Sequence, residues 1–475
     1  MLPKRAIFVN TASQVIVRFI TLAFTLISIK LLANYLGPSG VGNYNTITTY
    51  INFFIVIADI GLFAVAVREI SKTPENEKKI LSNVFFLRLV TALIASFIAV
   101  VIVYFTNYGQ DIKIGTLIAT AFLFFNLAAS AYDMALQCRL KMQYSAFAEF
   151  LSKLITILAL YIIIRMQGSF LWIISTVALS GVLIFVLKWI FSSRFIKISP
   201  SYDKKISFWI LNIAWPLGVV FIANNLFFKL DTLMLYVIKG ATAVGIYSVA
   251  YKILEVTVFI AGYFSSSLKP TFSQEIHNNK VALAKVIEKS SLVMLLSAIP
   301  ISVVCITFSR EIIIFLSNSE FVSGAPALIL LALSLPLIYL VTLLSEVLIA
   351  NDSRKILLNV AIFILIFNFL VNLIAIPLYS FMGAAVTTLI SEIVLLVIII
   401  YYTKKIVPFS VGTSPVFKSF ILFILTLFSA FLLKGLISIH FIILIAIVLF
   451  IYVVWGQILG IVNTKSLLKL IKGKE

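Results

Sequence analysis

The chain has 475 residues, of which 62% are hydrophobic and 12% are charged, and its formal net charge is +19. Soluble domains hold roughly a quarter charged residues. The composition therefore excludes a water-soluble globular protein and indicates an integral membrane protein. The two cysteines, Cys138 and Cys305, lie far apart in or beside apolar stretches, which argues against a disulfide framework or a thiolate metal site.

About fourteen apolar runs follow one another along the chain, each close to the roughly 20 residues that a helix needs to cross a bilayer. The runs lie near residues 8–35, 43–67, 80–106, 113–137, 144–165, 169–193, 207–238, 243–268, 290–309, 325–350, 356–378, 382–403, 416–436 and 439–460. They lack period-2 alternation and are too long for barrel strands. The sequence therefore predicts an all-α membrane protein with about fourteen transmembrane helices.

The Lys and Arg residues between these runs are divided unevenly. About 25 of them lie in the connections on one side, and the other side holds only Lys113, Arg165, Lys239, Arg310 and Lys434. Cytoplasmic loops carry the excess of Lys and Arg. We therefore expect a multi-pass protein of the plasma (cytoplasmic) membrane with both termini in the cytoplasm. This distribution explains most of the net charge without nucleic acid as a partner.

One short phrase occurs twice, each time between two apolar runs, as Val41-Gly42-Asn43-Tyr44 and as Val244-Gly245-Ile246-Tyr247. Six runs separate corresponding points, so both copies face the same side of the membrane, as in a parallel internal repeat. We expect two six-helix lobes related by a pseudo-two-fold axis along the membrane normal. They would comprise residues 1–195 and 207–405, joined by a cytoplasmic linker at 196–206. Residues 406–475 would add a helical hairpin (helices 13 and 14) and a basic cytoplasmic tail.

Ionisable residues inside the apolar runs are the main functional signal, because a charge at the centre of a membrane helix costs about 2.5–3.5 kcal/mol. Four of these residues should lie at a similar depth in the membrane, namely Lys229, Asp231, Lys252 and Glu255. At a helix rise of 1.5 Å per residue, each is roughly 15–20 Å from the turn near Ala241. Lys252 and Glu255 are spaced i, i+3 and can share a helix face. We expect such groups to face a partner or a water-filled cavity.

Structural roles are open for several of these residues. Arg88 and Lys188 lie within a few turns of the expected cytoplasmic side, where long side chains can snorkel to the surface. Glu149 and Lys153 form an i, i+4 pair in the favourable order and can neutralise each other. Glu392 stands in mid-helix, where a protonated structural carboxyl is as consistent with the sequence as a functional one.

Tyr35 through Tyr44 resembles the first-hairpin phrase of the polysaccharide transporter family. This family comprises the Wzx-like lipid-linked oligosaccharide flippases of the multidrug/oligosaccharidyl-lipid/polysaccharide (MOP) exporter superfamily. The segments Val244–Tyr247, Phe321–Ala332 and Pro377–Glu392 resemble, in order, the family's later hairpins and connections. The resemblance implies a transporter rather than an enzyme, with no cofactor. It would move a polyprenyl-pyrophosphate-linked oligosaccharide, such as an O-antigen, capsule or exopolysaccharide repeat unit, to the outer leaflet by alternating access.

The same resemblance assigns roles to the polar residues of the apolar runs. The pyrophosphate would be bound in a cavity by Arg18, Lys229, Lys252, Arg88 and Lys153. The sugars would contact Asn43, Thr48, Thr49, Asn52, Asn224, Asn225 and Tyr251. A coupling proton or sodium ion would bind among Asp59, Asp231, Glu255, Glu346 and Glu392. No bound metal cofactor is expected, and the partners would be membrane lipid, the lipid-linked glycan and glycan polymerases.

Two other functions stay open. An ion-coupled exporter of drugs or small molecules, like the multidrug and toxin extruders, would have an acidic cavity, whereas the runs here hold seven acidic and seven basic residues. A membrane glycan polymerase or ligase needs acid and base groups on a substrate-accessible face, and the outer connections are too short to hold such a site. The sequence has no Gly-Lys-Ser phosphate loop, which argues against ATP as the direct energy source.

Overall fold

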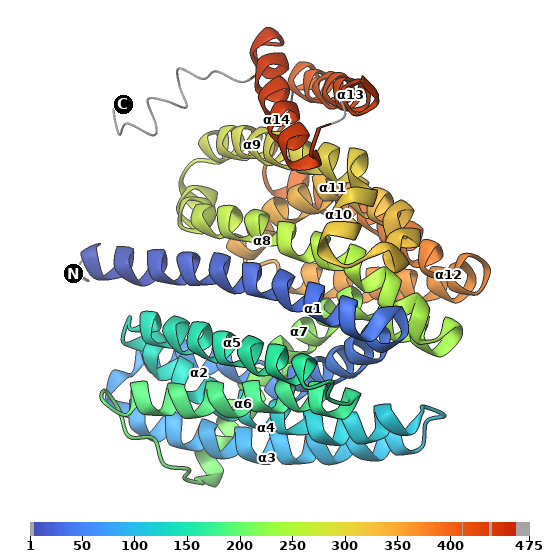
Figure 1. Cartoon of the computed structure of the whole chain (residues 1–475). Coiled ribbons are helices and arrows are strands. Elements are labelled where there is room, and N and C mark those ends of the chain that lie inside the picture. The colour runs from blue at the N-terminus through green and yellow to red at the C-terminus, as the bar shows by residue number, and fades with distance from the viewer. Residues whose placement is uncertain (1–3, 411, 437–438, 462–475) are drawn as a thin grey trace. The chain divides into compact units, whose positions relative to one another are not determined.

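The computed structural model describes residues 4–410, 412–436 and 439–461. Every regular element in the described part is helical (Figure 1). The elements are α1 (Lys4–Asp59), α2 (Leu62–Lys72), η1 (Pro74–Asn76), α3 (Glu77–Tyr104), α4 (Gln110–Cys138), α5 (Met142–Arg165), α6 (Phe170–Ser192), α7 (Lys204–Lys239), α8 (Ala241–Asn278), α9 (Lys280–Thr307), α10 (Ser309–Leu316), η2 (Ser319–Gly324), α11 (Ala325–Ala350), α12 (Arg354–Ile406), α13 (Thr413–Leu436) and α14 (Phe441–Ile458).

Two of the long helices are broken into two arms each. Gly37 breaks α1 at φ 61°, a left-handed conformation that glycine adopts without strain, and Ser380 breaks α12 at φ 55°. Eleven helical stretches in the described residues are long and apolar enough to cross a membrane. Counting both arms of α1 and α12 separately and adding α7 gives fourteen, so the expected all-α, multi-pass architecture is confirmed.

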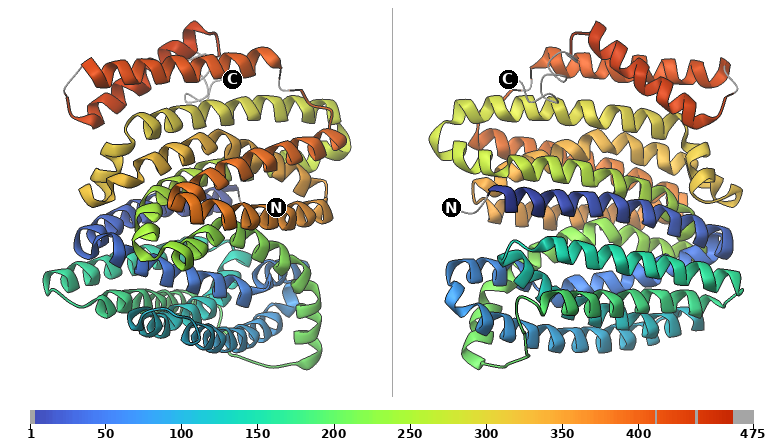
Figure 2. Two further views of the ribbon diagram at one scale, coloured as in Figure 1. Left: turned by 90° about the vertical axis from the view of Figure 1, so that its right-hand side faces the viewer. Right: turned by 60° about the vertical axis from the view of Figure 1, so that its left-hand side comes forward.

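Residues 1–245 form one compact unit, which contains α1 to α7 and the first turn of α8. Within it α4 packs against α3 and α6, and α1 packs against α3, α4 and α5. These helices lie side by side in Figures 1 and 2. Buried apolar side chains from four helices meet in the core of this unit, including Ile47 of α1, Ala99 of α3, Leu123 of α4 and Ile174 of α6.

Residues 246–475 form the second compact unit. Its α11 packs against both α9 and α12. The Tyr339 hydroxyl of α11 donates a hydrogen bond to the Thr257 carbonyl of α8, at 2.8 Å. The hairpin α13–α14 lies along α9 (Figure 2). There, Leu422 and Val448 share a buried cluster with Val303, so the expected additional hairpin is a packed part of this unit.

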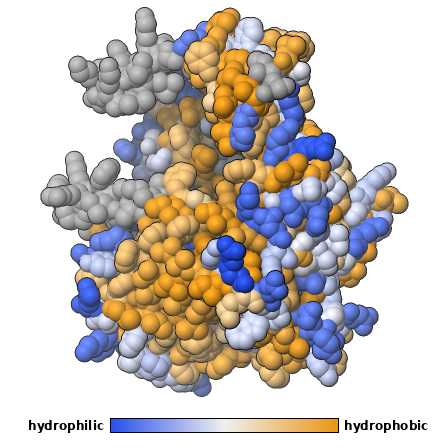
Figure 3. Space-filling view, in the orientation of Figure 1, coloured by the Kyte–Doolittle hydropathy of each residue, from blue (hydrophilic) through white to orange (hydrophobic). Residues whose placement is uncertain are grey.

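The flanks of the helices expose large apolar side chains, as expected for a surface that faces lipid. On α3 these include Leu93, Phe97 and Tyr104, which are 60%, 70% and 69% exposed. Figure 3 shows hydrophobic residues covering a broad area of the first unit, with hydrophilic residues mostly toward its edges and a strongly hydrophilic spot within it. The apolar band and the helix lengths together identify a multi-pass membrane protein.

Candidate functional site

Three of the five cations expected to bind the pyrophosphate lie on three different helices. Arg18 of α1 and Lys229 of α7 are half-buried, and so is Lys252 of α8. The Lys252 ammonium forms an ion pair with Glu255, with Nζ and Oε2 2.6 Å apart. The two side chains are 30% and 24% exposed. The expected i, i+3 contact is therefore present, and it leaves both charged groups partly accessible.

Arg88 occupies a different environment from these three residues. Its side chain is only 2% exposed, and its guanidinium forms an ion pair with Asp59 at the end of α1. The Nε atom of Arg88 is buried and has no hydrogen-bond partner. The alternative in which Arg88 snorkels is wrong. Its charge is balanced by a protein carboxylate, which does not favour Arg88 as a ligand of substrate.

A second ion-pair group, centred on the buried Lys188, crosses three helices of the first unit. Lys188 of α6, 4% exposed, lies 2.7 Å from Asp133 of α4 and 3.0 Å from Glu149 of α5. The Ser145 hydroxyl donates to the other oxygen of Asp133, at 2.6 Å. The interpretation that Lys188 snorkels to the membrane surface is therefore wrong as well. Glu149 accepts a hydrogen bond from the Lys188 ammonium. The half-buried Lys153, with which Glu149 was expected to pair, stands one helical turn further along α5. The two groups, Asp59–Arg88 and Asp133–Lys188–Glu149, are called the ion-pair ladder below.

The residues expected to meet sugars are spread over three helices. Thr48 and the exposed Asn52 stand one turn apart on α1, and the Asn52 amide donates to the Thr48 carbonyl at 2.7 Å. The Asn43 amide oxygen accepts a hydrogen bond from the Tyr236 hydroxyl at 3.2 Å, and Thr49 is buried.

The remaining sugar-contact residues lie on α7 and α8. Tyr251 is buried, with its ring centroid 5.5 Å from that of Tyr247. Asn225 is exposed on α7, and the side chain of Asn224 lies outside the described residues.

Among the carboxyls expected to bind a coupling ion, two are almost fully buried. Asp231 of α7 is 3% exposed and accepts the Thr232 backbone N–H at 2.7 Å. Glu392 of α12 is 2% exposed, and its Oε2 atom has no hydrogen-bond partner. Glu346 is half-buried, and its carboxylate lies 3.6 Å from the Lys269 ammonium.

A buried polar group that includes Ser391, the neighbour of Glu392 in the sequence, connects the two arms of α12. The Asn368 amide donates to the Ser391 hydroxyl at 3.2 Å and accepts from the Asn372 amide at 2.9 Å. The Oδ1 atom of Asn372 and the Oγ1 atom of Thr387 are buried without partners. Sequence reasoning selected Glu392 but missed the asparagines, although their i, i+4 spacing within an apolar run was a visible signal.

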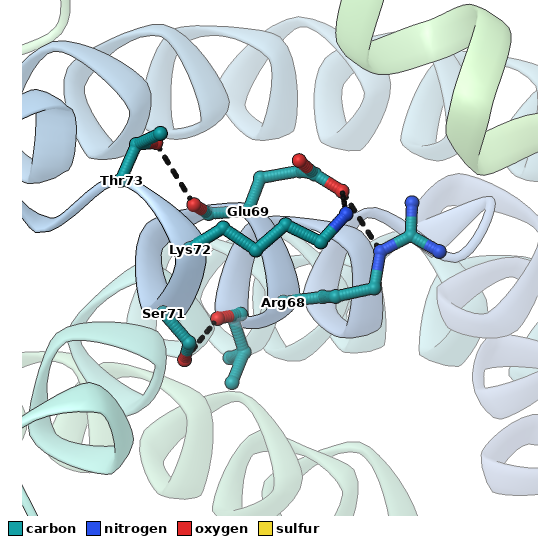
Figure 4. Close-up of polar contacts among 6 residues, drawn as sticks. Arg68, Glu69, Ser71, Lys72 and Thr73 are labelled. Atoms are coloured by element: carbon teal, nitrogen blue, oxygen red, sulfur yellow. Dashed lines mark hydrogen bonds and ion pairs between the residues drawn. The ribbon is translucent and has the colours of Figure 1, made fainter.

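A further polar cluster closes the end of α2 (Figure 4). Glu69 is buried and accepts hydrogen bonds from Arg68 at 2.8 Å and from Lys72 at 3.1 Å. The Thr73 hydroxyl donates to the Glu69 carbonyl at 3.0 Å. These contacts neutralise a buried carboxylate and cap the last turn of α2, which is a structural role. No group of three or more His, Cys, Asp or Glu side chains in the described residues is placed to bind a metal ion.

Comparisons with known proteins agree with this architecture. A family model described as polysaccharide biosynthesis protein matches residues 5–276, and a model described as MatE matches residues 216–374. An uncharacterized membrane protein of Methanocaldococcus jannaschii is 24% identical over 410 residues, which cover 79% of this chain and 80% of that protein. The resemblance drawn from the hairpin phrases is thereby confirmed.

Solved structures of two kinds share the fold. A structure of lipid II flippase MurJ in an inward closed conformation matches with a TM-score of 0.79 and 18% identity, over 94% of this chain and 98% of that one. An outward-facing multidrug resistance MATE family transporter matches with a TM-score of 0.63 and 14% identity, over 85% and 95%. The chain therefore belongs to the polysaccharide biosynthesis protein family and has the fold of the transporters of the MOP superfamily.

Proposed function

We propose that this protein is a flippase that moves a polyprenyl-pyrophosphate-linked oligosaccharide from the cytoplasmic to the outer leaflet by alternating access. The observation that carries the proposal is the likeness to a lipid II flippase over 94% of the chain, with a TM-score of 0.79. The polysaccharide biosynthesis family match over residues 5–276 supports a glycan cargo. The MATE structures cover less of the chain, 82% to 85% in the two conformations compared.

The ion pair between Lys252 and Glu255 suggests how the head group is bound. A pyrophosphate presents several anionic oxygens, and its hydrogen bonds to a lysine are stronger than those between neutral groups. In this proposal the pyrophosphate displaces Glu255 from the half-buried Lys252. Arg18 and Lys229, both half-buried on apolar helices, supply further positive charge. Asn52 and Asn225, which are exposed, are the proposed sugar contacts.

The same exchange offers a route to ion coupling. A proton or cation that neutralises Glu255 would weaken its hold on Lys252, so that ion binding and substrate binding favour each other. Glu392 is a second candidate, because its side chain is 2% exposed and its Oε2 atom is buried without a hydrogen-bond partner. An ionised carboxylate in such a place needs a proton or a cation.

The proposed orientation follows the distribution of basic residues. Both termini and the linker at 196–206 would lie in the cytoplasm, where Lys and Arg residues of membrane proteins accumulate. The substrate would then be loaded from the leaflet in which lipid-linked precursors are assembled. A glycan polymerase on the outer side is the proposed consumer of the product.

Ligand binding tests the substrate class directly. The purified protein is heated in detergent with a polyprenyl-pyrophosphate sugar, with the matching monophosphate, or with the neutral polyprenol. A ligand that binds the native state raises the melting temperature. We expect the pyrophosphate to raise it most and the polyprenol least, and Lys252→Ala to remove the difference. Equal shifts for all three lipids would contradict a pyrophosphate site.

A drug exporter is the second candidate, because the MatE family model matches residues 216–374. Such a protein would protect a host that lacks its own efflux pumps against cationic dyes. Resistance in that host, together with no melting shift from the pyrophosphate lipid, would favour the exporter over the flippase.

A further inference from the structure

The segment between α6 and α7 is attached to the first unit at two separate points. At the first point, the Phe195 carbonyl accepts a hydrogen bond from the Arg139 guanidinium. Arg139 is itself held by two hydrogen bonds to Glu77, at 3.0 and 2.9 Å. The Phe195 ring lies 5.0 Å from the Tyr144 ring, and the Lys141 ammonium lies 5.6 Å from its centroid. This end of the linker is thus fixed by both polar and aromatic contacts.

The second point is centred on Asn83 of α3, whose side chain is only 1% exposed. Its Oδ1 atom accepts the Asp203 backbone N–H at 2.6 Å and the Ser207 hydroxyl at 3.2 Å. Its Nδ2 atom donates to the Lys79 carbonyl at 2.9 Å. A buried amide with all these bonds satisfied specifies one position for the chain that contacts it.

The residues around Asn83 add further bonds to the same segment. The Ser201 backbone N–H donates to the Ser82 carbonyl at 3.1 Å, and the Tyr202 ring lies 5.2 Å from the Phe86 ring. Asp203 also caps α7, and hydrogen bonds from the backbone N–H groups of Ile206 and Lys205 hold its pKa below the usual value.

Helix α7 continues this attachment along its length. Ile210 and Ala214 are fully buried in a cluster with residues of α2, α3 and α4. Further along, Gly218 lies so close to Ile60 that an added Cβ would be 2.6–2.8 Å from the Ile60 backbone. Near its end, the Tyr236 hydroxyl of α7 donates to the Asn43 amide oxygen of α1 at 3.2 Å, and the Tyr236 ring lies 4.9 Å from the Tyr108 ring. Helix α7 is therefore attached to the first unit from its start to its last turns.

We infer that α7 moves as a part of the first lobe, with residues 195–207 as a clamp. Asn83 is then the positioning residue that fixes α7 to α3. The internal repeat alone would place a joint at the linker 196–206, because α7 is the first helix of the second copy. The contacts instead dock this linker on Asn83 and group all of α7 with the first unit.

This inference rests on the proposed alternating access and makes it more specific. Lys229 and Asp231 are carried by α7 in the first unit, whereas Lys252 and Glu255 lie on the part of α8 that belongs to the second unit. A movement between the two units would therefore carry one proposed pair of ligands with each unit.

A disulfide across the clamp tests this arrangement. In a background with Cys138→Ala and Cys305→Ala, Ser82→Cys and Ser201→Cys are combined, because a backbone hydrogen bond already joins these positions. Transport is measured as leaflet exchange of a fluorescent polyprenyl-pyrophosphate sugar, before and after oxidation. We expect the oxidised protein to keep its transport rate within about twofold. A loss on oxidation that a reductant restores would overturn the inference, and so would a folded double variant that forms no disulfide.

Asn83→Ala gives the second, independent test. Removing the amide leaves its partners unsatisfied, which should lower transport by about tenfold through undocking of α7. Adding the 82–201 disulfide should restore most of that loss, and failure of this rescue would overturn the positioning role. No transport by the wild-type protein would instead contradict the proposed function, so the two failures are distinguishable.

Discussion

Gly42 and Gly245 occupy equivalent places in the two copies of the repeated phrase, and each packs against the backbone of the other copy's hairpin. A Cβ on Gly42 would overlap the carbonyl oxygen of Ala241, and a Cβ on Gly245 would overlap that of Pro38. Pro38 and Ala241 each stand four residues before the glycine of their own copy. The contact is therefore reciprocal, and small residues allow this close approach of helix backbones. The repeat predicted two similar hairpins, and the structure adds that they touch.

Gly42→Ala and Gly245→Ala should each destabilise the protein. Either methyl group overlaps a backbone carbonyl that cannot rotate away, so we expect a loss of about 1–3 kcal/mol, as for overpacked cores. Thermal unfolding in detergent measures the loss of stability. Gly262→Ala is the matched control, because an added Cβ there meets no atom within 4 Å. A Gly42→Ala protein as stable as Gly262→Ala would disprove the close packing.

Removing one charge of the ion-pair ladder should destabilise the protein, whereas replacing both charges of a pair with apolar side chains should destabilise it much less. Asp133→Ala leaves the buried Lys188 with one partner fewer, and removal of one member of a buried pair typically costs about 3–5 kcal/mol. The double variant Asp133→Leu with Lys188→Met removes both charges and should recover most of that loss. Thermal unfolding of the single and double variants checks this. If the double variant were less stable than Asp133→Ala, the ladder would have a role beyond charge balance.

Lys252→Ala should abolish glycan export while the protein still inserts in the membrane. Its ammonium is one of the half-buried cations that the proposal assigns to the pyrophosphate, and alanine cannot replace its charge-assisted hydrogen bonds. Export is measured in cells that depend on this protein, with the amount in the membrane as reference. The control is Lys239→Ala, an exposed lysine at the end of α7, which should export normally.

Glu392→Gln should separate transport from its ion gradient. The substitution keeps the shape of the side chain and removes its titratable proton, so the protein should fold and bind substrate. We expect the stimulation of transport by an imposed proton or sodium gradient to disappear. Glu320→Gln, at an exposed glutamate, is the control and should keep that stimulation. A Glu392→Gln protein that still responds to the gradient would place the coupling ion elsewhere.

The helices could be predicted from the sequence because apolar length and turn residues are local properties. The break at Gly37, for example, follows from a Gly-Pro turn between two runs. The partners of buried charges could not be predicted in the same way. Depth along a helix follows from residue counting, but the direction of a side chain depends on how the helices rotate against one another. For this reason the pairs Arg88–Asp59 and Lys188–Asp133 emerged only from the packing.

The linker illustrates the same limit. Its basic and polar residues indicated a solvated connection, and nothing in 196–206 identifies Asn83, more than a hundred residues earlier, as its partner. The lobe boundaries at 195 and 207 stay a prediction based on the repeat, whereas side-chain and backbone contacts group α7 with the first unit. Symmetry of sequence therefore does not determine which helices pack together.

Leaflet exchange in reconstituted liposomes tests the central claim most directly. The purified protein is placed in vesicles that contain a fluorescent polyprenyl-pyrophosphate sugar, and the fraction accessible to a membrane-impermeant quencher is followed in time. The proposal predicts that the wild-type protein accelerates exchange of this lipid and that Lys252→Ala does not. Equal rates for wild-type, Lys252→Ala and protein-free vesicles would contradict it.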